Sequence, residues 1–271
     1  MTAEMEYVLG TTDAEIQRLD LQHTVWRSDA THAWRAASFR PGNTIIDVGC
    51  GPGFATFDLA ELVGPRGRIH AIDQSARFTA HTERQAVARG LQNVVTTTAD
   101  LNEFDFDGLV ADGAWIRWVL AFVRQPRRVL SKLATALRPG GRLVIHEYFA
   151  YETWRVLPGD EEFDRFVAAV MQSWRRRGGE PNVGLSVIPW LEDLGFRILT
   201  TRTISELIRP NDPRWDWPTT FALSGVDRLV GLGDCSASDG ERWRLRMREL
   251  FAAGPWMFTP SVLEVIAECA G

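Results

Sequence analysis

Residues 44–54 read Thr-Ile-Ile-Asp-Val-Gly-Cys-Gly-Pro-Gly-Phe, and this stretch decides the fold. It opens with residues that are apolar or β-branched apart from Asp47, which predicts a buried strand over Thr44–Val48. An amphipathic segment begins at Phe54, and every second residue before it is a glycine: Gly49, Gly51 and Gly53. The stretch therefore predicts a strand, a tight glycine turn and a helix in immediate succession.

The glycine turn is a candidate binding site. Glycine tolerates positive φ and lets a ligand approach the bare backbone, and the helix behind the turn offers free N–H groups. Enzymes that bind dinucleotides place a pyrophosphate on such a helix and use the spacing G-x-G-x-x-G. Here the spacing is G-x-G-x-G, with Asp47 two residues ahead of it. A carboxylate at that position disfavours a phosphate and favours a ligand with a cationic end.

Two further acids follow predicted strands. The second strand, predicted over residues 68–72, ends at Asp73, about 20 residues past the turn. A carboxylate at this position can accept hydrogen bonds from both hydroxyls of an unphosphorylated ribose. The third strand, predicted over residues 94–98, is followed by Asp100 and Leu101.

The pattern from Asp47 to Gly53 resembles the D/E-x-G-x-G-x-G signature of the class I S-adenosylmethionine-dependent methyltransferases. Asp73, the pair Asp100-Leu101 and the turn Leu-Arg-Pro-Gly-Gly at residues 137–141 follow in the order typical of that family. The resemblance implies an α/β fold, a Rossmann-like doubly wound sheet of seven strands in the order 3-2-1-4-5-7-6, with the last strand antiparallel. It also implies S-adenosyl-L-methionine as cofactor and S-adenosyl-L-homocysteine as product.

The same resemblance implies a cofactor site built from strand ends and an N-terminal arm. The first turn would hold the amino-acid end, Asp73 the ribose, and Asp100 with Leu101 the adenine. The end of the fourth strand, predicted over residues 108–115, would lie beside the sulfonium. The expected cofactor residues are Asp47, Gly49, Cys50, Gly51, Gly53, Asp73, Gln74, Asp100, Leu101, Ala114, Trp115, Tyr7, Gln22 and Trp26.

Helical periodicity and turns divide the rest of the chain. The arm, residues 1–40, is predicted to hold two helical pieces, and a helix carrying the apolar residues 118–122 is predicted after the fourth strand. Two insertions with amphipathic helices leave the sheet and are expected to form a lid over the cofactor side. The predicted core comprises residues 41–148, 186–205 and 256–271, and the predicted lid comprises residues 149–185 and 206–255.

Candidate catalytic residues stand at the end of the fifth strand, predicted over residues 142–148. Ligands of open α/β sheets bind beyond the carboxyl ends of the strands, where this strand carries His146, Glu147 and Tyr148. His146 is the first choice for a general base, because the ordinary pKa of histidine is near 6.5. A structural role for His146 is the alternative, and an amine acceptor would need no strong base.

The acceptor is expected to lie under the lid. Its candidate contacts are Arg117, Tyr151, Trp154 and Trp174. Arg117 could bind an acceptor carboxylate or brace the neighbouring helix. Several tryptophans stand on the inserted segments, and an aromatic roof would suit a water-poor pocket. A single tryptophan more often belongs to the core, but at least two of this set are expected to face the pocket.

Composition narrows the functional classes. The chain has 271 residues and a formal net charge of −5, so nothing indicates a surface for nucleic acid. Cys50, Cys235 and Cys269 are too widely spaced for a disulfide framework or a metal site. No signal pattern is visible, and the longest apolar run, 114–123, is short and interrupted, which predicts no membrane span and a cytoplasmic location. The oligomeric state stays open, a homodimer included.

The sequence therefore predicts a methyltransferase that acts on an apolar or aromatic small molecule by O-, N- or C-methylation, in secondary metabolism or quinone-like biosynthesis. One alternative is a methyltransferase-like protein that binds the cofactor without methyl transfer, as a sensor, a scaffold or the host of another reaction. An NAD-dependent dehydrogenase is a second alternative. Asp73 fits it, but the glycine spacing and Asp47 do not.

Overall fold

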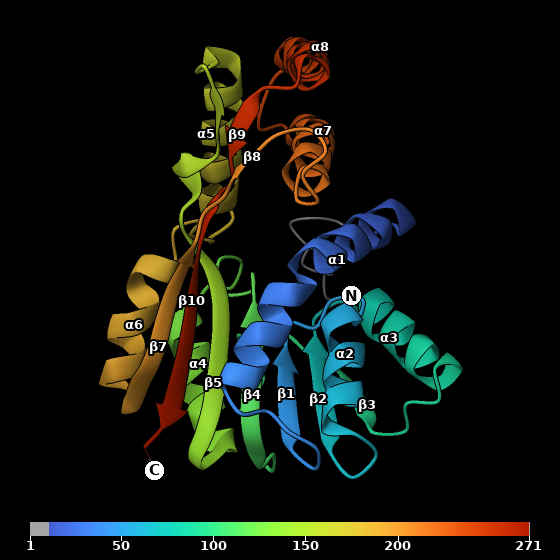
Figure 1. Cartoon of the computed structure of the whole chain (residues 1–271), viewed down its shortest axis with the longest axis vertical. Helices are drawn as coiled ribbons and strands as arrows, with labels where there is room; N and C mark the ends of the chain where they lie inside the picture. The colour runs from blue at the N-terminus through green and yellow to red at the C-terminus, as the bar shows by residue number, and fades with distance from the viewer. Residues whose placement is uncertain (1–10, 271) are drawn as a thin grey trace.

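The strand β1 (Thr44–Val48) is an interior strand of a seven-stranded sheet in the computed structural model, which describes residues 11–270 (Figure 1). The strand order is β3-β2-β1-β4-β5-β10-β7. The pairs from β3 to β5 are parallel, whereas β10 is antiparallel to both β5 and β7. The other strands are β2 (Arg68–Asp73), β3 (Val94–Thr98), β4 (Ala111–Arg117), β5 (Leu137–Ala150), β7 (Phe196–Ile204) and β10 (Ser261–Cys269). The predicted fold class and strand order are confirmed.

Helices cover both faces of this sheet. The side chains of β1 alternate between the two faces, so its apolar residues need a packing partner on each face. Ile45 packs in a cluster with residues of α1 (Asp13–Ala36) and α2 (Phe54–Val63). Ile46 and Val48 pack in the cluster that contains residues of α4 (Pro126–Ala136) and α6 (Gly184–Asp193). The helix α3 (Ala76–Ala88) follows β2, and Ser75 caps it as an acceptor for the Phe78 N–H.

The helix α1 is continuous, so the prediction of two helical pieces in the arm is wrong. Two carboxylates tie the middle of α1 to other elements. Arg27 donates to both carboxylate oxygens of Asp58 in α2, and Asp29 accepts from Arg202 and Arg214. These contacts come from distant parts of the chain, which explains why local periodicity did not predict the continuity.

The predicted helix over residues 118–122 is also absent, and a turn follows β4 instead. Trp118 has φ of 53°, a left-handed conformation that breaks helical hydrogen bonding. The Glu147 carboxylate accepts hydrogen bonds from the Val119 and Leu120 N–H groups at 2.7 and 2.6 Å, and Trp118 N–H donates to the His146 carbonyl. These contacts with β5 satisfy the backbone of the turn.

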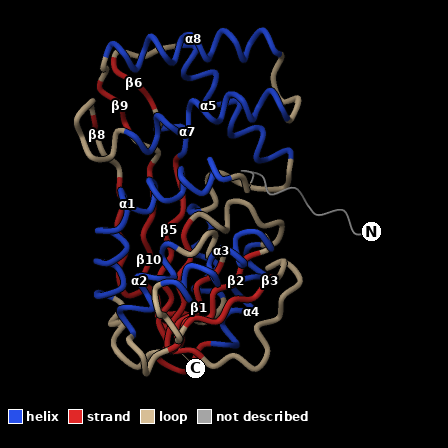
Figure 2. Tube along the Cα trace, turned by 90° about the vertical axis from the view of Figure 1, so that its right-hand side faces the viewer, coloured by secondary structure: helices blue, strands red, loops and turns tan. Residues whose placement is uncertain are grey.

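A second, small sheet and three helices form the lid. The sheet has the order β6-β9-β8 and consists of β6 (Arg155–Leu157), β8 (Leu207–Ile208) and β9 (Trp256–Phe258). The helices α5 (Glu161–Arg176), α7 (Asp216–Gly231) and α8 (Ala237–Ala253) gather at the end of the molecule away from the chain's C-terminus (Figure 2). Residues 256–258, which the sequence assigns to the core, therefore pair within the lid sheet. A short 3₁₀ helix, η1 (Tyr151–Thr153), connects β5 to β6.

None of the helices formed by residues 11–270 combines the length and the apolar character that a membrane span requires.

Ile46→Ala is expected to destabilise the chain by about 2–5 kcal/mol, because Ile46 is fully buried at the centre of the sheet and truncation leaves a cavity. Urea denaturation followed by circular dichroism measures the change. Val110→Ala is the control, since Val110 is 59% exposed and its truncation should change stability by less than about 0.5 kcal/mol. Equal stabilities of the two variants would contradict the proposed core.

Candidate functional site

A cavity of about 400 Å³ opens at the carboxyl ends of β1, β2, β4 and β5, between the sheet and the lid. Residues of α1 and the glycine turn line one side of it, and residues of α5 and α7 line another. The first half of α1 lies between α7 and the sheet (Figure 1). Segments far apart in the sequence therefore meet around one cavity.

The glycine turn presents bare backbone to this cavity. Gly51 has φ of 55°, and a Cβ at this position would meet no atom within 4 Å, so its backbone faces open space. Its N–H donates to Asp73 Oδ2 at 2.9 Å, while Asp73 Oδ1 accepts from the Ser75 N–H at 2.8 Å. Gly53 instead allows the turn to pack closely against α3, because a Cβ at this position would lie 2.6 Å from the Thr82 side chain.

Two buried carboxylates stand at adjacent strand ends. Asp47 accepts a hydrogen bond from the Thr56 hydroxyl at 2.6 Å, and Asp73 accepts the two backbone bonds described above. Burial raises the pKa of each to about 6. Both line the cavity, so each can still accept a hydrogen bond from a ligand.

A third acid lies at the end of β3. Asp100 Oδ1 accepts from the Asn102 backbone N–H at 2.9 Å and from its side-chain amide at 2.7 Å. Arg124 approaches Asp100 Oδ2 at 3.7 Å. Asp100, Leu101 and Asn102 all line the cavity, as does Gln74 beyond the end of β2.

Arg117 ends β4 beside the first turn. Its Nη2 lies 3.0 Å from His23 Nδ1, and His23 Nε2 lies 3.0 Å from Asp58 Oδ2. Because an ionised carboxylate only accepts, His23 Nε2–H donates to Asp58, which leaves His23 Nδ1 to accept from Arg117. Burial lowers the pKa of His23, which favours this neutral form.

A family model described as a methyltransferase domain matches residues 39–174, which is half of the chain and contains the whole glycine turn. The chain belongs to the class I S-adenosylmethionine-dependent methyltransferase family. The predicted family and cofactor are thereby confirmed, because the family is S-adenosylmethionine-dependent and solved structures of this fold contain S-adenosyl-L-homocysteine.

Two relatives illustrate the range of this methyltransferase family. An uncharacterised 37.1 kDa protein of a Streptomyces fradiae transposon is 27% identical over 259 residues, which cover 94% of this chain and 71% of that protein. The ubiquinone/menaquinone biosynthesis C-methyltransferase UbiE of Brucella canis is 30% identical over 131 residues, which cover 48% of each protein. The chain thus spans about half the length of this second relative.

Solved structures share the methyltransferase fold across the lid as well. Coclaurine N-methyltransferase, bound to N-methylheliamine and S-adenosyl-L-homocysteine, superposes with a TM-score of 0.57 and 16% identity over 89% of this chain and 72% of its own. The [4+2]-cyclase SpnF superposes with a TM-score of 0.57 and 16% identity over 88% and 79%. At these identities the similarity shows the fold alone.

The cavity has the donor and acceptor chemistry that S-adenosylmethionine needs. The cofactor carries an ammonium group, a carboxylate, a ribose diol and an adenine. Carboxylates at three neighbouring strand ends, bare backbone at Gly51 and the guanidinium of Arg117 surround one space. The residues of the chain therefore fit the cofactor of its family.

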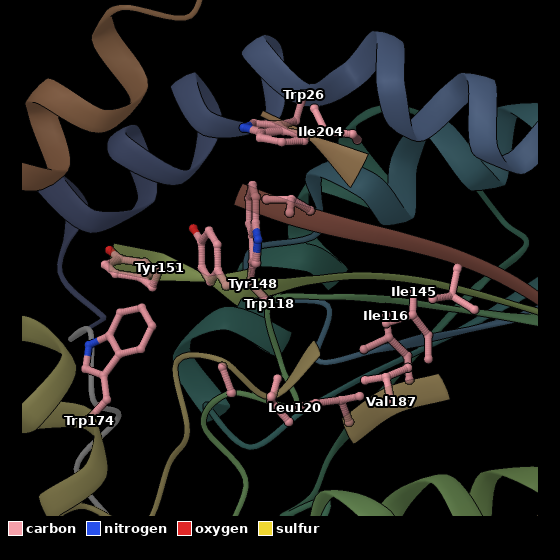
Figure 3. Packing of buried hydrophobic residues seen from close by; sticks show 14 of the residues in the cluster. Trp26, Ile116, Trp118, Leu120, Ile145, Tyr148, Tyr151, Trp174, Val187 and Ile204 are labelled. Atoms are coloured by element: carbon pink, nitrogen blue, oxygen red, sulfur yellow. The ribbon is translucent and has the colours of Figure 1, made fainter. Parts of the chain in front are cut away.

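An aromatic wall forms the other side of the cavity. The Trp118 ring stacks on Tyr148 with centroids 5.4 Å apart and on Trp217 of α7 with centroids 5.7 Å apart. Trp26 meets Trp118 edge-on at 5.1 Å (Figure 3). Trp118 and Tyr148 line the cavity together with Phe122, Trp174 and Phe221.

His146 and Glu147 do not reach the cavity. His146 is fully buried, its Nε2 lies 2.8 Å from Glu264 Oε2 of β10, and burial lowers its pKa. Glu147 Oε1 accepts two hydrogen bonds from backbone N–H groups of the turn after β4, and burial raises the pKa of Glu147 to about 8. The base role expected for these two side chains therefore has no geometric support. Of the three predicted catalytic residues, only Tyr148 lines the cavity.

The structure divides the other predicted site residues into two groups. Those that line the cavity are Gln22, Asp47, Gly49, Cys50, Gly51, Asp73, Gln74, Asp100, Leu101, Trp115, Arg117 and Trp174. Those that lie outside its lining are Gly53, Ala114, Trp26, Tyr151 and Trp154. Tyr7 lies outside the residues that the structure describes.

Sequence reasoning missed several residues that line the cavity. Arg18, Leu19 and His23 come from the face of α1 that also carries Gln22, so helical spacing from Gln22 could have identified them. Trp118 and Phe122 were expected on a helix, which hid their contact with the cavity. Arg177 and Phe221 come from the lid, and no local signal marks them.

Asp47→Asn is expected to stabilise the ligand-free protein at pH 8 by about 1–3 kcal/mol. The folded pKa of Asp47, about 6, exceeds the ordinary value, so ionisation above pH 6 costs the native state free energy. The asparagine side chain would keep the hydrogen bond from Thr56 without the charge.

The difference between Asp47→Asn and wild type should be largest above pH 6, shrink as the pH falls from 6 towards 4, and vanish below about 4, because Asp47 is then protonated in the unfolded chain as well as in the native state. Urea unfolding of both proteins at pH 5, 6, 7 and 8 measures it. A variant that is less stable than wild type at pH 8 would show that the charge of Asp47 does not destabilise the ligand-free native state.

Proposed function

We propose that this chain transfers the methyl group of S-adenosylmethionine to a small apolar or aromatic acceptor. One observation carries the proposal: a single cavity is lined by the glycine turn and three strand-end carboxylates on one side and by aromatic side chains of the sheet and lid on the other. The first side suits the cofactor, and the second suits a flat or apolar molecule beside it.

The proposed cofactor contacts follow from the chemistry of each position. Asp47 would accept from the ammonium group, and Asp73 from the two ribose hydroxyls. Asp100 would accept from the adenine amino group, with Leu101 against the ring. Asp73 also holds the Gly51 and Ser75 backbone, so the acid that binds the ribose would fix the shape of the turn as well.

When bound, S-adenosylmethionine supplies an electrophilic methyl group on a sulfonium, whose positive charge disappears as the methyl leaves. The chain would supply orientation and a dry environment. Orienting two reactants can lower the barrier by roughly 7–11 kcal/mol. Trp118, Phe122, Trp174 and Phe221 line the acceptor side and would keep water out of it. A transition state that loses charge is less disfavoured in such a pocket than in water.

The acceptor side offers no strong base among the described residues. Burial raises the pKa of Tyr148 above its ordinary value, so its hydroxyl stays protonated and can donate or accept a hydrogen bond. His23 already engages Arg117 and Asp58 through its two ring nitrogens. We therefore infer an acceptor that is nucleophilic without help, such as an amine, an acidic phenol or a quinol-type carbon.

Tyr151 and Trp154 support the aromatic wall from behind. Both are buried. The ring centroids of Tyr151 and Tyr148 lie 4.9 Å apart, and those of Trp154 and Tyr151 lie 5.9 Å apart. A setting in quinone-like biosynthesis or secondary metabolism is part of the proposal. Its support is that one relative is named for ubiquinone/menaquinone biosynthesis.

A second candidate function is cofactor binding without methyl transfer. The absence of a strong base on the acceptor side among residues 11–270 favours it, and one protein of the same fold is named as a [4+2]-cyclase. The two functions differ in the fate of the labelled methyl group. Incubation with methyl-labelled S-adenosylmethionine and a panel of phenols, quinols and aromatic amines should yield S-adenosylhomocysteine and one labelled product. Cofactor binding with no turnover across the panel and a cell extract would favour the second function.

Asp73→Ala should weaken both S-adenosylmethionine and S-adenosylhomocysteine by at least about tenfold, because a charged hydrogen bond contributes roughly 1.5–3 kcal/mol. Isothermal titration calorimetry measures the affinities. Asp107→Ala is the control, since Asp107 is exposed and lies outside the cavity lining. An unchanged affinity in a folded Asp73→Ala protein would move the ribose site elsewhere.

A further inference from the structure

Arg117 differs from Arg18 and Arg177, two other arginines that line the cavity, in its lack of a carboxylate partner among residues 11–270. Arg18 donates to Glu15 at 2.7 Å, and Arg177 donates to Asp234 at 2.6 Å, so both have a carboxylate partner. Arg117 forms no ion pair with any carboxylate of residues 11–270. Its Nη2 contacts the neutral ring of His23, and its Nη1 is buried without a hydrogen-bond partner among these residues.

A cation in this position calls for an anion. Burial lowers the pKa of Arg117 only to about 10, so the guanidinium stays protonated at neutral pH. A buried charge without a counter-charge is strongly unfavourable relative to a paired one. The unpartnered Nη1 and the cavity beside it are therefore the features of a site whose anion comes from a ligand.

Asp47 is the neighbour that indicates which ligand. The two charges influence each other, since Arg117 lowers the pKa of Asp47 and Asp47 raises that of Arg117, yet they do not pair directly. In the register of the sheet Val48 lies opposite Ile116, so Arg117 follows at the level of Gly49. The acidic Asp47 and the basic Arg117 thus flank the start of the glycine turn, and both line the cavity.

We propose that Arg117 binds the α-carboxylate of the cofactor's amino-acid end, opposite Asp47, which binds the α-ammonium group. This assignment rests on the proposed function. A ligand that carries both charges on one carbon satisfies both buried groups at once, whereas an acceptor carboxylate would leave Asp47 without its cation. The inference replaces the expectation that Arg117 contacts the acceptor.

His23 is the positioning residue for this arginine. Asp58 accepts from His23 Nε2–H, and Arg27 donates to both oxygens of Asp58 at 2.7 and 2.8 Å. The chain of contacts fixes the ring so that Nδ1 accepts from Arg117. Because His23 is neutral, it orients the guanidinium without competing for its charge.

The test compares S-adenosylhomocysteine with decarboxylated S-adenosylhomocysteine, which lacks only the α-carboxylate, by calorimetry on wild type and on Arg117→Met. Wild type should bind the complete ligand at least tenfold more tightly. Arg117→Met keeps an unbranched stem without the charge and should reduce this ratio to about one. Arg84→Met, an exposed change on α3, is the control and should leave the ratio at its wild-type value.

Three results would overturn the assignment. The first is a wild type that binds the two ligands equally, which decides the matter even if Arg117→Met does not fold. The second is an Arg117→Met protein that keeps the wild-type ratio. The third is an Arg117→Met protein with unchanged affinity for S-adenosylhomocysteine and lost turnover, which would return Arg117 to the acceptor. No binding of either ligand by wild type would instead refute the proposed function itself.

His23→Leu tests the positioning role separately. Its affinity for the decarboxylated ligand should stay near that of wild type, while the ratio between the two ligands falls at least threefold. A structural role alone would change both affinities equally and leave the ratio unaltered. An unaltered ratio would therefore remove His23 from the proposal.

Discussion

The burial of negative charge at the carboxyl end of β1 is the constraint on which the rest of this structure depends. Asp47 lies among apolar side chains at the centre of the sheet, and its only hydrogen bond from the described residues is donated by Thr56. The neighbouring strands place Asp73 and Arg117 around it. A fold selected for stability alone would fill these positions with apolar residues, because buried ionic groups contribute little to stability even when they are paired.

The parts of this arrangement that could be predicted from sequence are those with a local cause. The strand, glycine turn and helix around residues 44–63 follow from spacing, and the acids at the ends of β2 and β3 follow from where β-branched runs stop. The parts that could not be predicted depend on partners far along the chain. His146 is paired with Glu264, which stands on another strand 118 residues later. The strands β6, β8 and β9 are only two or three residues long, too short for any periodicity to appear.

Glu147 illustrates how a residue predicted for chemistry can serve shape instead. Its carboxylate holds two backbone N–H groups of the turn after β4 and thereby stabilises the left-handed conformation of Trp118. Backbone strain of this kind costs of order 1–3 kcal/mol and persists where the surroundings enforce it. The strained turn aims Trp118 between Tyr148 of the sheet and Trp217 of the lid, so the aromatic wall depends on a carboxylate that the cavity never meets.

The unpaired charges around β1 also connect the protein to its surroundings in the cell. A ligand that occupies the native state and not the unfolded chain adds about 2.7 kcal/mol of stability at a concentration one hundred times its dissociation constant. Molecules that lack the ligand would be the ones that open and meet proteases. The abundance of this protein would then follow the supply of S-adenosylmethionine, and a shortage of this ligand would lower the amount of folded protein.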